Sequence, residues 1–440
     1  MKNDSGLKST IGLPQAVALY IGAVLGSGVL LVPGLAAEIA GPASLLAWGL
    51  MTLLVLPMAL AMGLLSAKYP NAGGVSHFVT VAFGPHAGAI VGWFFLMSVP
   101  IGAPVAAITG AGYLTAAMGW GDHARVIISA AILLFGLLTN LTGMKIAGQV
   151  QIAVVISIVA VLVLAIIGAS PHIEKINFTP FMPHGWISVG QAAAILFWCF
   201  IGWEAVSHLS EEFVDPQREA VKGVTIAAII VGVLYFLTAL ATVGTHSYHA
   251  AGSDASLVIV ISRMLGSAGA IVAGLTGVFI CTATVIAYAG AASRLAFALS
   301  RSGEAPRWMG MFSDKFGTPI GGIAFLACCF AVVLLLYGSH AVSLTTLIQF
   351  PNATFILTYL GGCAAGIRLL KGNAWGVRIS WLSFLLTAVI FPFVGWAILY
   401  PVVIIGVFLA ADKFKQRASH ARSDAHSENT FPQASGEARR

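Results

Sequence analysis

Two short segments of the sequence place helix-weakening residues in the middle of a long apolar run. Gly26-Ser27-Gly28 interrupts the first run, and Phe200-Ile201-Gly202 interrupts a later one. Glycine disfavours a helix because it loses much backbone freedom there, and serine competes for backbone hydrogen bonds. A helix that opens inside a membrane needs a polar partner for its freed amides and carbonyls, because lipid provides none. The chemistry expected at both places is binding of a polar solute, with a carboxylate at the amides and a cation at the carbonyls. The alternative is that Gly26 and Gly28 only allow close helix packing.

Glu204 lies well inside an apolar run, whereas Glu38 lies near the end of another and the rest of the 16 acidic residues lie outside such runs. An ionised carboxylate at the centre of a membrane helix costs about 2.5–3.5 kcal/mol. Two interpretations follow. Glu204 changes protonation and couples transport to a proton gradient, or it is a fixed hydrogen-bond acceptor for the broken helix. His208 would share its helical face, but it lies near the end of the run and we assign it no role.

The composition excludes a soluble protein. Of the 440 residues, 58% are hydrophobic and 9% are charged, whereas a soluble domain carries about 25% charge. The 49 glycines and 18 prolines lie mostly within apolar stretches, as membrane helices tolerate. The net charge of +6 is not gathered into a basic patch, so no nucleic-acid partner is expected. The five cysteines lack the spacing of a metal site, and we expect no metal and no cofactor.

The apolar runs predict about twelve membrane spans, because roughly 20 apolar residues cross a bilayer. They fall at about 11–38, 42–66, 86–117, 125–142, 148–169, 187–210, 223–245, 267–299, 319–337, 342–366, 376–391 and 394–411. With a cytoplasmic N-terminus, all of the 22 lysines and arginines except Arg125, Lys175 and Arg263 fall on the cytoplasmic side. This bias is typical of membrane proteins and predicts that both termini are cytoplasmic.

The two interruptions lie about five spans apart, which favours an inverted repeat of five plus five helices. We therefore divide the chain into a cytoplasmic N-terminus (1–10), a transmembrane domain (11–411) and a polar, disordered cytoplasmic tail (412–440). Within the domain, the first repeat covers about 11–169, the second about 187–366, and two extra helices about 376–411. Residues 256–265 are expected to form either a short amphipathic helix on the outer face or a plain loop.

Several motifs resemble the amino acid-polyamine-organocation (APC) transporters. They are Gly26-Ser27-Gly28-Val29, Tyr69 to Gly74, Phe197 to Glu204, Glu211 to Arg218, Ser293-Arg294, Arg301 to Pro306 and Asn352-Ala353-Thr354, so the resemblance covers about residues 7–412. It implies an all-α, LeuT-like membrane fold with broken helices 1 and 6. It also implies that the amides of Ser27 and Gly28 receive a substrate carboxylate and that carbonyls near Val24, Trp198 and Ile201 receive its ammonium. Trp198 matches a gating aromatic residue, although packing between helices is the alternative.

The finer motifs are most similar to bacterial exporters of L-methionine and branched-chain amino acids. They are Phe197-Trp198-Cys199-Phe200, Glu204-Ala205, His208-Leu209 and Glu212-Phe213. One departure is Ile158, which stands where related transporters often carry a lysine that fills the place of a sodium ion. No coupling role can therefore be carried over to that position.

The sequence thus predicts a secondary active transporter in a bacterial inner membrane, with no enzymatic activity. It would export L-methionine, leucine, isoleucine and valine by alternating access, with or without antiport of protons. No second charge is visible for a dibasic or dicarboxylic substrate. The apolar subsite would draw on Val24, Ile201, Trp203 and Met97. The substrate site as a whole comprises Val24, Gly26, Ser27, Gly28, Trp198, Ile201 and Gly202, with Glu204 as the coupling candidate.

Three alternatives stay open beside this prediction. An amino acid importer or an exchanger would use the same fold, and the sequence does not give an oligomeric state. A membrane-embedded enzyme is remote, because His77, His86, His172 and His184 fall in different loops and no paired carboxylates accompany them.

Overall fold

The computed structural model describes residues 12–71, 73–142, 144–207, 210, 213–248, 256–313 and 316–428. The described chain is almost wholly helical and contains an isolated β-bridge between Ser313 and Thr318. The α-helices are α1 (Leu13–Val24), α2 (Ser27–Ala40), α3 (Ser44–Lys68), α4 (Gly74–Phe83), α5 (Pro85–Met118), α6 (Asp122–Thr142), α7 (Met144–Ala169), α8 (Gly185–Leu196), α9 (Trp203–Ser207), α10 (Pro216–Gly244), α11 (Ser256–Arg301), α12 (Ile320–Gly338), α13 (Leu344–Leu369), α14 (Ala374–Ile390) and α15 (Leu399–Glu428). The 3₁₀-helices are η1 (Gly41–Ala43), η2 (Ser170–His172), η3 (Lys175–Phe178), η4 (Phe197–Phe200), η7 (Arg307–Gly310) and η8 (Phe391–Ile398).

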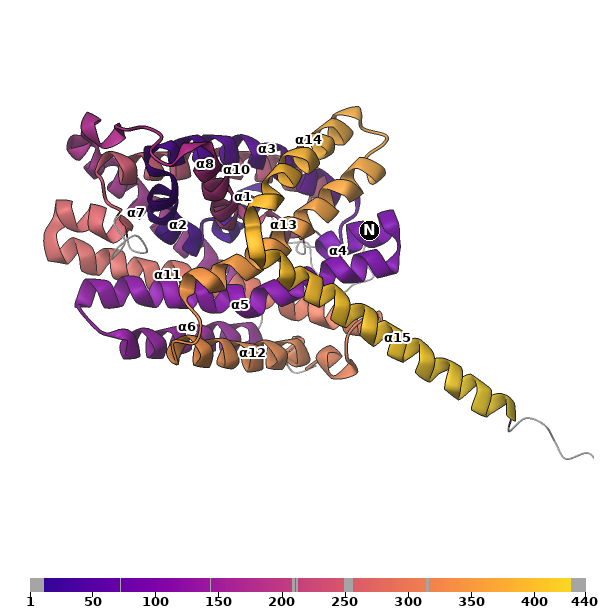
Figure 1. The fold of residues 1–440 in the computed structure, drawn as a ribbon. Helices are drawn as coiled ribbons and strands as arrows, with labels where there is room; N and C mark the ends of the chain where they lie inside the picture. The colour runs from indigo at the N-terminus through magenta and orange to yellow at the C-terminus, as the bar shows by residue number, and fades with distance from the viewer. Residues whose placement is uncertain are drawn as a thin grey trace, which may run out of the picture.

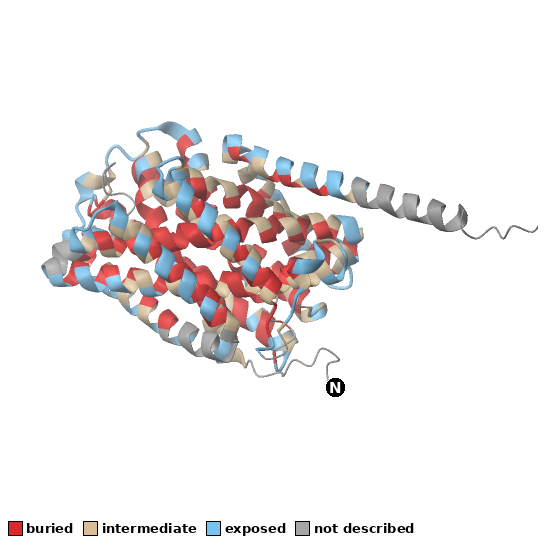
Figure 2. Ribbon diagram, turned by 90° about the horizontal axis from the view of Figure 1, so that it is seen from below, coloured by how far each residue is buried: buried red, intermediate tan, exposed pale blue. Residues whose placement is uncertain are grey.

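The helices form one bundle suited to a membrane. Eight segments of the described chain are long and apolar enough to cross one. Two of them, Ser27–Lys68 and Ala374–Lys413, contain 42 and 40 residues, which is room for two crossings each, since about 20 residues suffice. Figure 2 shows buried residues filling the middle of the bundle and exposed residues along its outer surfaces. Many of the exposed side chains are large and apolar, such as Leu53 and Leu335, as expected for a surface that faces lipid.

Both predicted helix interruptions are present. Helix α1 ends at Val24 and α2 begins at Ser27. The second interruption is longer, because α8 passes into η4, and α9 begins only at Trp203. Gly202, between η4 and α9, has a φ of 136°, which side-chain-bearing residues rarely adopt. A Cβ atom at Gly202 would also lie 2.5 Å from the Ala23 carbonyl oxygen, so the two interruptions touch each other.

Three long helices from distant parts of the sequence enclose these interruptions. Helices α5 and α11 pack along each other, and α13 packs against α5. In Figure 1, α5 and α11 run side by side below α1, α2 and α8. Helix α10 packs against α1 and α3. The centre of the bundle is therefore formed by two interrupted segments within a cage of continuous helices.

Some segments differ from the sequence-based expectations. Helix α4 lies where a loop was expected. Residues 256–265 are helical, as one of the two interpretations predicted, and Gly266, with a φ of 62°, separates them from the rest of α11. Helix α15 continues to Glu428, beyond the point at which the polar tail was expected to begin, and projects from the bundle (Figure 1). Its polar part contains alanine, lysine, arginine and glutamine, which favour helix locally even without a core. The expected N-terminus 1–10, His208 and residues 429–440 lie outside the described residues.

Candidate functional site

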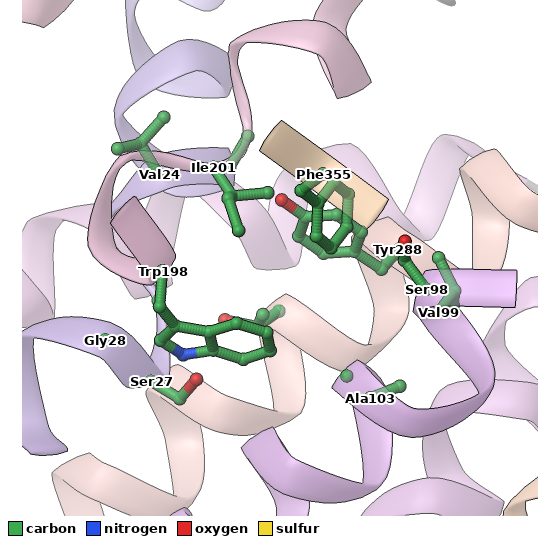
Figure 3. Close-up of a pocket in the computed structure, with 14 residues that line it drawn as sticks. Val24, Ser27, Gly28, Ser98, Val99, Ala103, Trp198, Ile201, Tyr288 and Phe355 are labelled. Carbon is green, nitrogen blue, oxygen red and sulfur yellow. The ribbon is translucent and has the colours of Figure 1, made fainter. Parts of the chain in front are cut away.

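A small cavity lies where the two interrupted segments meet α5, α11 and α13 (Figure 3). Its lining contains no charged side chain and consists of Ala23, Val24, Gly26, Ser27, Gly28, Ser98, Val99, Gly102, Ala103, Trp198, Ile201, Thr284, Tyr288 and Phe355. We call it the central cavity. Its volume is about 30 Å³, which has room for a few water molecules only. In this structure the space is therefore too small for an amino acid.

Six of the residues predicted for the substrate site line the central cavity. They are Val24, Gly26, Ser27, Gly28, Trp198 and Ile201. Gly202 and Glu204 follow directly in the chain and lie outside the lining. Of the candidates for an apolar subsite, Met97 lines a different cavity beside α15, and Trp203 is fully buried near the ring of Tyr20. Val24 and Ile201 do line the central cavity, and Val99, Ala103 and Phe355 add further apolar walls.

The start of α2 brings free backbone amides to the cavity. Gly26 precedes the helix in an extended conformation, and no side chain caps the helix start. The first amides of a helix have no partner within it, and its dipole makes this end positive. Ser27 and Gly28 supply the first two of these amides and both line the cavity. This is the geometry that proteins use to hold a carboxylate.

The end of α1 is tied to the second interruption by one hydroxyl group. The Val24 carbonyl oxygen lies 2.7 Å from the Gly26 amide and 2.7 Å from the Tyr235 hydroxyl, and both donate to it. The same hydroxyl lies 2.9 Å from the carbonyl oxygen of Cys199 in η4. The hydroxyl has a single hydrogen, so the Val24 and Cys199 carbonyls share it. Tyr235 of α10 thus holds both interruptions together, and the Val24 carbonyl already has two donors close to it.

Glu204 is fully buried beside the central cavity. Its Oε2 atom accepts hydrogen bonds from the Gly202 amide, at 2.9 Å, and from the Tyr359 hydroxyl. The hydroxyl of Tyr288 lies 3.5 Å from Oε1. Because Tyr288 also lines the cavity, a single hydroxyl separates the Glu204 carboxyl from the cavity. The bond from the Gly202 amide is expected if Glu204 is a fixed hydrogen-bond acceptor for the broken helix. It does not test whether Glu204 also changes protonation during transport.

Trp198 closes one side of the cavity from η4. Its indole lies beneath Ile201 and extends toward α5 in Figure 3. A Cβ atom on Gly102 of α5 would stand only 3.2 Å from the indole Cη2 atom. The indole ring therefore packs against Gly102, the residue of this turn of α5 that has no side chain.

The sequence reasoning missed the contributions of the continuous helices. Ser98, Thr284, Tyr288 and Phe355 line the cavity from α5, α11 and α13. Ser98 and Thr354 also share a hydrogen bond of 2.6 Å between their hydroxyl oxygens. Hydroxyl side chains inside otherwise apolar helices could have predicted which helices line the cavity. Each hydroxyl needs a hydrogen-bond partner, which lipid does not offer.

Comparison with known proteins points to one family. A family model described as amino acid permease matches residues 11–414. The uncharacterized amino acid permease YecA of Bacillus subtilis is 38% identical over 398 residues, which is 90% of this chain and 94% of that protein. The L-methionine/branched-chain amino acid exporter YjeH of Escherichia coli is 30% identical over 416 residues, 93% and 98% of the two chains. The branched-chain amino acid permease BcaP of Bacillus subtilis is 28% identical over 72% of each chain. The chain therefore belongs to the amino acid permease family of the APC superfamily.

Proposed function

We propose that this membrane protein is a secondary active transporter of neutral, apolar amino acids. One observation carries the proposal: a small, buried cavity without charged side chains has the free amides of a helix start in its lining. A carboxylate bound there is neutralised by the helix start. A second charge on the substrate side chain would be buried without a partner, which is unfavourable.

Each part of an amino acid has a proposed place in the central cavity. The carboxylate binds the amides of Ser27 and Gly28, next to Gly26. The ammonium binds the carbonyls of Trp198 and Ile201, since Val24 is already paired with Tyr235. The substrate side chain contacts the apolar walls that Val99, Ala103 and Phe355 form. Leucine, isoleucine, valine and methionine fit these walls better than any charged amino acid.

The proposed direction is export from the cytoplasm of a bacterial cell across the inner membrane. Its support is the similarity to YjeH, which is described as an exporter of L-methionine and branched-chain amino acids. Similarity to the permease BcaP supports the same substrate class without a direction. An importer or an exchanger on this fold is the alternative.

The proposed membrane arrangement has about twelve spans with both termini in the cytoplasm. The segments Ser27–Lys68 and Ala374–Lys413 each provide two of these spans, and the two interrupted segments occupy matching places in two inverted five-helix repeats. The repeats cover about 11–169 and 187–366, followed by extra helices at about 376–411. Alternating access then means that the two repeats rock around the central cavity.

Substrate entry requires Trp198 to move, because the closed central cavity is far smaller than an amino acid. We assign Trp198 the role of a gate. Its place on η4 suits this role, because a short 3₁₀ segment between α8 and α9 can change direction with few rotated bonds. Opening would also break its contact with Gly102 of α5.

The test is efflux from vesicles that contain the purified protein. Vesicles are preloaded with labelled methionine, leucine or arginine, and efflux is measured with and without an inward proton gradient. Efflux of methionine and leucine but not arginine supports a transporter of neutral amino acids, and acceleration by the gradient supports proton antiport. Efflux that needs amino acid on the far side identifies an exchanger. Equal efflux of arginine would overturn the substrate assignment.

Glu204→Gln tests proton coupling. Glutamine keeps an oxygen that can accept from Gly202 and fits the same space, so the folded structure should be retained. If Glu204 carries the coupled proton, the gradient-driven efflux of the variant is at least about tenfold slower. Exchange of amino acid between equal concentrations on the two sides continues. Efflux is measured across a series of external pH values. A variant with the full pH dependence of the unmodified protein leaves Glu204 with a structural role alone.

A further inference from the structure

The cavity beside α15 is much larger than the central cavity, with a volume of about 510 Å³. We call it the α15 cavity. Its lining comes from α5, from the loop Gly303–Pro306 that follows α11, and from one face of α15 between Tyr400 and Asp412. Helix α15 packs against α5 and then projects from the bundle (Figure 1). The α15 cavity therefore lies at the edge of the bundle and not at its centre.

The α15 cavity has the depth of one leaflet of a bilayer. From Tyr400 to Asp412 the helix rises by about 18 Å, and half of the hydrocarbon core of a bilayer is about 15 Å thick. Ile404 and Phe408 of the lining are each 8% exposed, whereas Val403 and Val407 are 61% and 65% exposed. The cavity thus has a buried apolar floor and an exposed apolar rim. Such a space opens sideways toward lipid.

Two contacts between α5 and α15 bound this space. At one end the Tyr400 hydroxyl donates to the Met97 carbonyl oxygen at 2.8 Å. At the other end the Nε2 atom of His86 lies 3.3 Å from the Oδ2 atom of Asp412. The two helices therefore touch at both ends and leave a long, narrow space between them. An extended apolar chain has the shape that fits such a space.

The charged side chains in the described part of the lining are both acidic. They are Glu304 and Asp412. The indole Nε1 atom of Trp93 donates to the Glu304 carbonyl oxygen at 3.0 Å and holds this residue against α5. Carboxylates accept hydrogen bonds, and an ammonium has three donors for them. Exposed cations follow both acids in the chain, namely Arg307 and Lys413. The polar end of the α15 cavity is therefore suited to a headgroup that carries an ammonium and a phosphate.

We propose that the α15 cavity binds one phospholipid with a primary ammonium headgroup from the cytoplasmic leaflet. The ammonium binds Asp412 and Glu304, and one acyl chain lies along Ile404 and Phe408 toward Tyr400. The leaflet follows from the proposed topology, which places this end of α15 in the cytoplasm. The site goes beyond the proposed function and holds for any transported substrate.

This lipid would lie directly behind one wall of the central cavity. Met97 lines the α15 cavity, and the next two residues of α5, Ser98 and Val99, line the central cavity. One helix therefore separates the proposed lipid from the proposed substrate.

The test measures lipid binding to the purified full chain. The protein is delipidated in detergent and incubated with phosphatidylethanolamine, phosphatidylcholine or phosphatidylglycerol that carry the same acyl chains. Native mass spectrometry over a series of lipid concentrations counts the lipids bound per chain. We expect one phosphatidylethanolamine, bound at least about tenfold more tightly than the other two lipids. Phosphatidylcholine has no N–H donor for a carboxylate, and phosphatidylglycerol has no ammonium. Equal binding of all three lipids would overturn the headgroup assignment.

Two variants test the two parts of the site. Asp412→Asn keeps the shape of the side chain but removes its charge, so phosphatidylethanolamine should bind about tenfold more weakly. Val407→Trp fills the cavity and should abolish the bound lipid. Unchanged binding by Asp412→Asn would overturn the ammonium assignment. Unchanged binding by Val407→Trp would place the lipid elsewhere and overturn the site.

The controls separate lipid binding from the packing of α15. His86→Ala removes the contact with Asp412 but keeps the carboxylate, so it should still bind phosphatidylethanolamine. Val402→Trp adds the same ring at an exposed position of α15 outside the described lining and should bind normally. Equal losses in His86→Ala and Asp412→Asn would mean that the carboxylate only joins α15 to α5, which would overturn the ammonium assignment. A pair of protein chains that Val407→Trp separates would identify a second copy as the occupant and overturn the lipid site.

Discussion

The two helix interruptions differ in how their backbone groups are satisfied. Between α1 and α2 only Leu25 and Gly26 leave the helix, and no side chain caps the start of α2. Between α8 and α9 the interruption is longer, and side chains from elsewhere bind its backbone. Asn352 donates to Ala194, Tyr235 to Cys199, and the Gly202 amide donates to Glu204. The start of α2 therefore offers free amides to a ligand. In the second interruption Ala194, Cys199 and Gly202 are already bonded to side chains, and the carbonyls of Trp198 and Ile201 are the groups that we assign to a ligand.

Because of this difference, the two helix interruptions are suited to different roles. The uncapped start of α2 is suited to bind, because its amides lack partners until a carboxylate arrives. The second interruption is suited to position and move Trp198, because its bonds come from α10 and α13 and change when those helices shift. Inverted repeats alone would suggest equivalent roles for the two places. The hydrogen bonds at the two places differ, and on that ground we propose distinct roles.

Both interruptions nevertheless depend on contacts that only glycine permits. A Cβ atom on Gly28 would lie 2.9 Å from the Cα atom of Cys199, and one on Gly202 would lie 2.5 Å from the Ala23 oxygen. Real Cβ atoms do not approach backbone so closely. Each interruption thus uses a glycine to accept the backbone of the other.

Gly202→Ala should have the largest effect. The alanine would combine an unfavourable positive φ with a backbone clash, so we expect a loss of about 3 kcal/mol or more of folding stability. Thermal unfolding of the purified protein measures this loss. Gly84→Ala is the matched control, because Gly84 has a φ of 98° but no atom within 4 Å of its Cβ position. An equal loss in both variants would show that strain, and not contact between the interruptions, is responsible.

Gly28→Ala should have the next largest effect, mainly on binding. Its methyl group would push the start of α2 away from η4 and displace the amides that we assign to the carboxylate. We expect leucine binding to weaken by about tenfold or more, with about 1–3 kcal/mol of stability lost. Gly49→Ala on α3 has open space apart from Phe236 at 4.0 Å and should bind normally. Normal binding by Gly28→Ala would contradict the carboxylate assignment.

Tyr235→Phe should have the smallest effect of the three. It removes the hydroxyl shared by Val24 and Cys199 but keeps the ring, and the Val24 carbonyl retains the Gly26 amide. We expect a loss of about 1–2 kcal/mol of stability, measured by thermal unfolding. Leucine binding should fall less than in Gly28→Ala. A loss greater than that of Gly202→Ala would mean that the hydroxyl, and not the glycine contacts, holds the interruptions together.

The sequence was most informative where the cause is local. Gly26-Ser27-Gly28 weakens its own helix, so the first interruption could be placed within two residues. The second was predicted at Phe200-Ile201-Gly202, and there the chain does leave the helix, between η4 and α9. The bonds that Asn352 and Tyr235 make to α8 and η4 could not be predicted. Such bonds join residues 158 and 36 positions apart, and no pattern along one helix reveals them.

The partners of Glu204 show the same limit. Its burial could be predicted from its place in an apolar run, but Tyr288 and Tyr359 lie 84 and 155 residues away. Many tyrosines in the sequence were equally plausible partners. The side walls of the central cavity were missed for a similar reason, since the face that α5 or α13 turns inward depends on its neighbours. Helix α4 was missed because its ten residues are too few to produce a span-length signal.

The uncapped start of α2 has a consequence for how substrate preference can change. Every amino acid has the same carboxylate, and in the proposed binding mode the main chain binds this shared group, which substitutions alter little. The substrate side chain, which differs from one amino acid to another, would contact side chains on α5 and α13, such as Val99 and Phe355. Substitutions at these walls can retune the range of substrates without rebuilding the anchor. A family with this division can diversify its cargo while its core backbone stays constant.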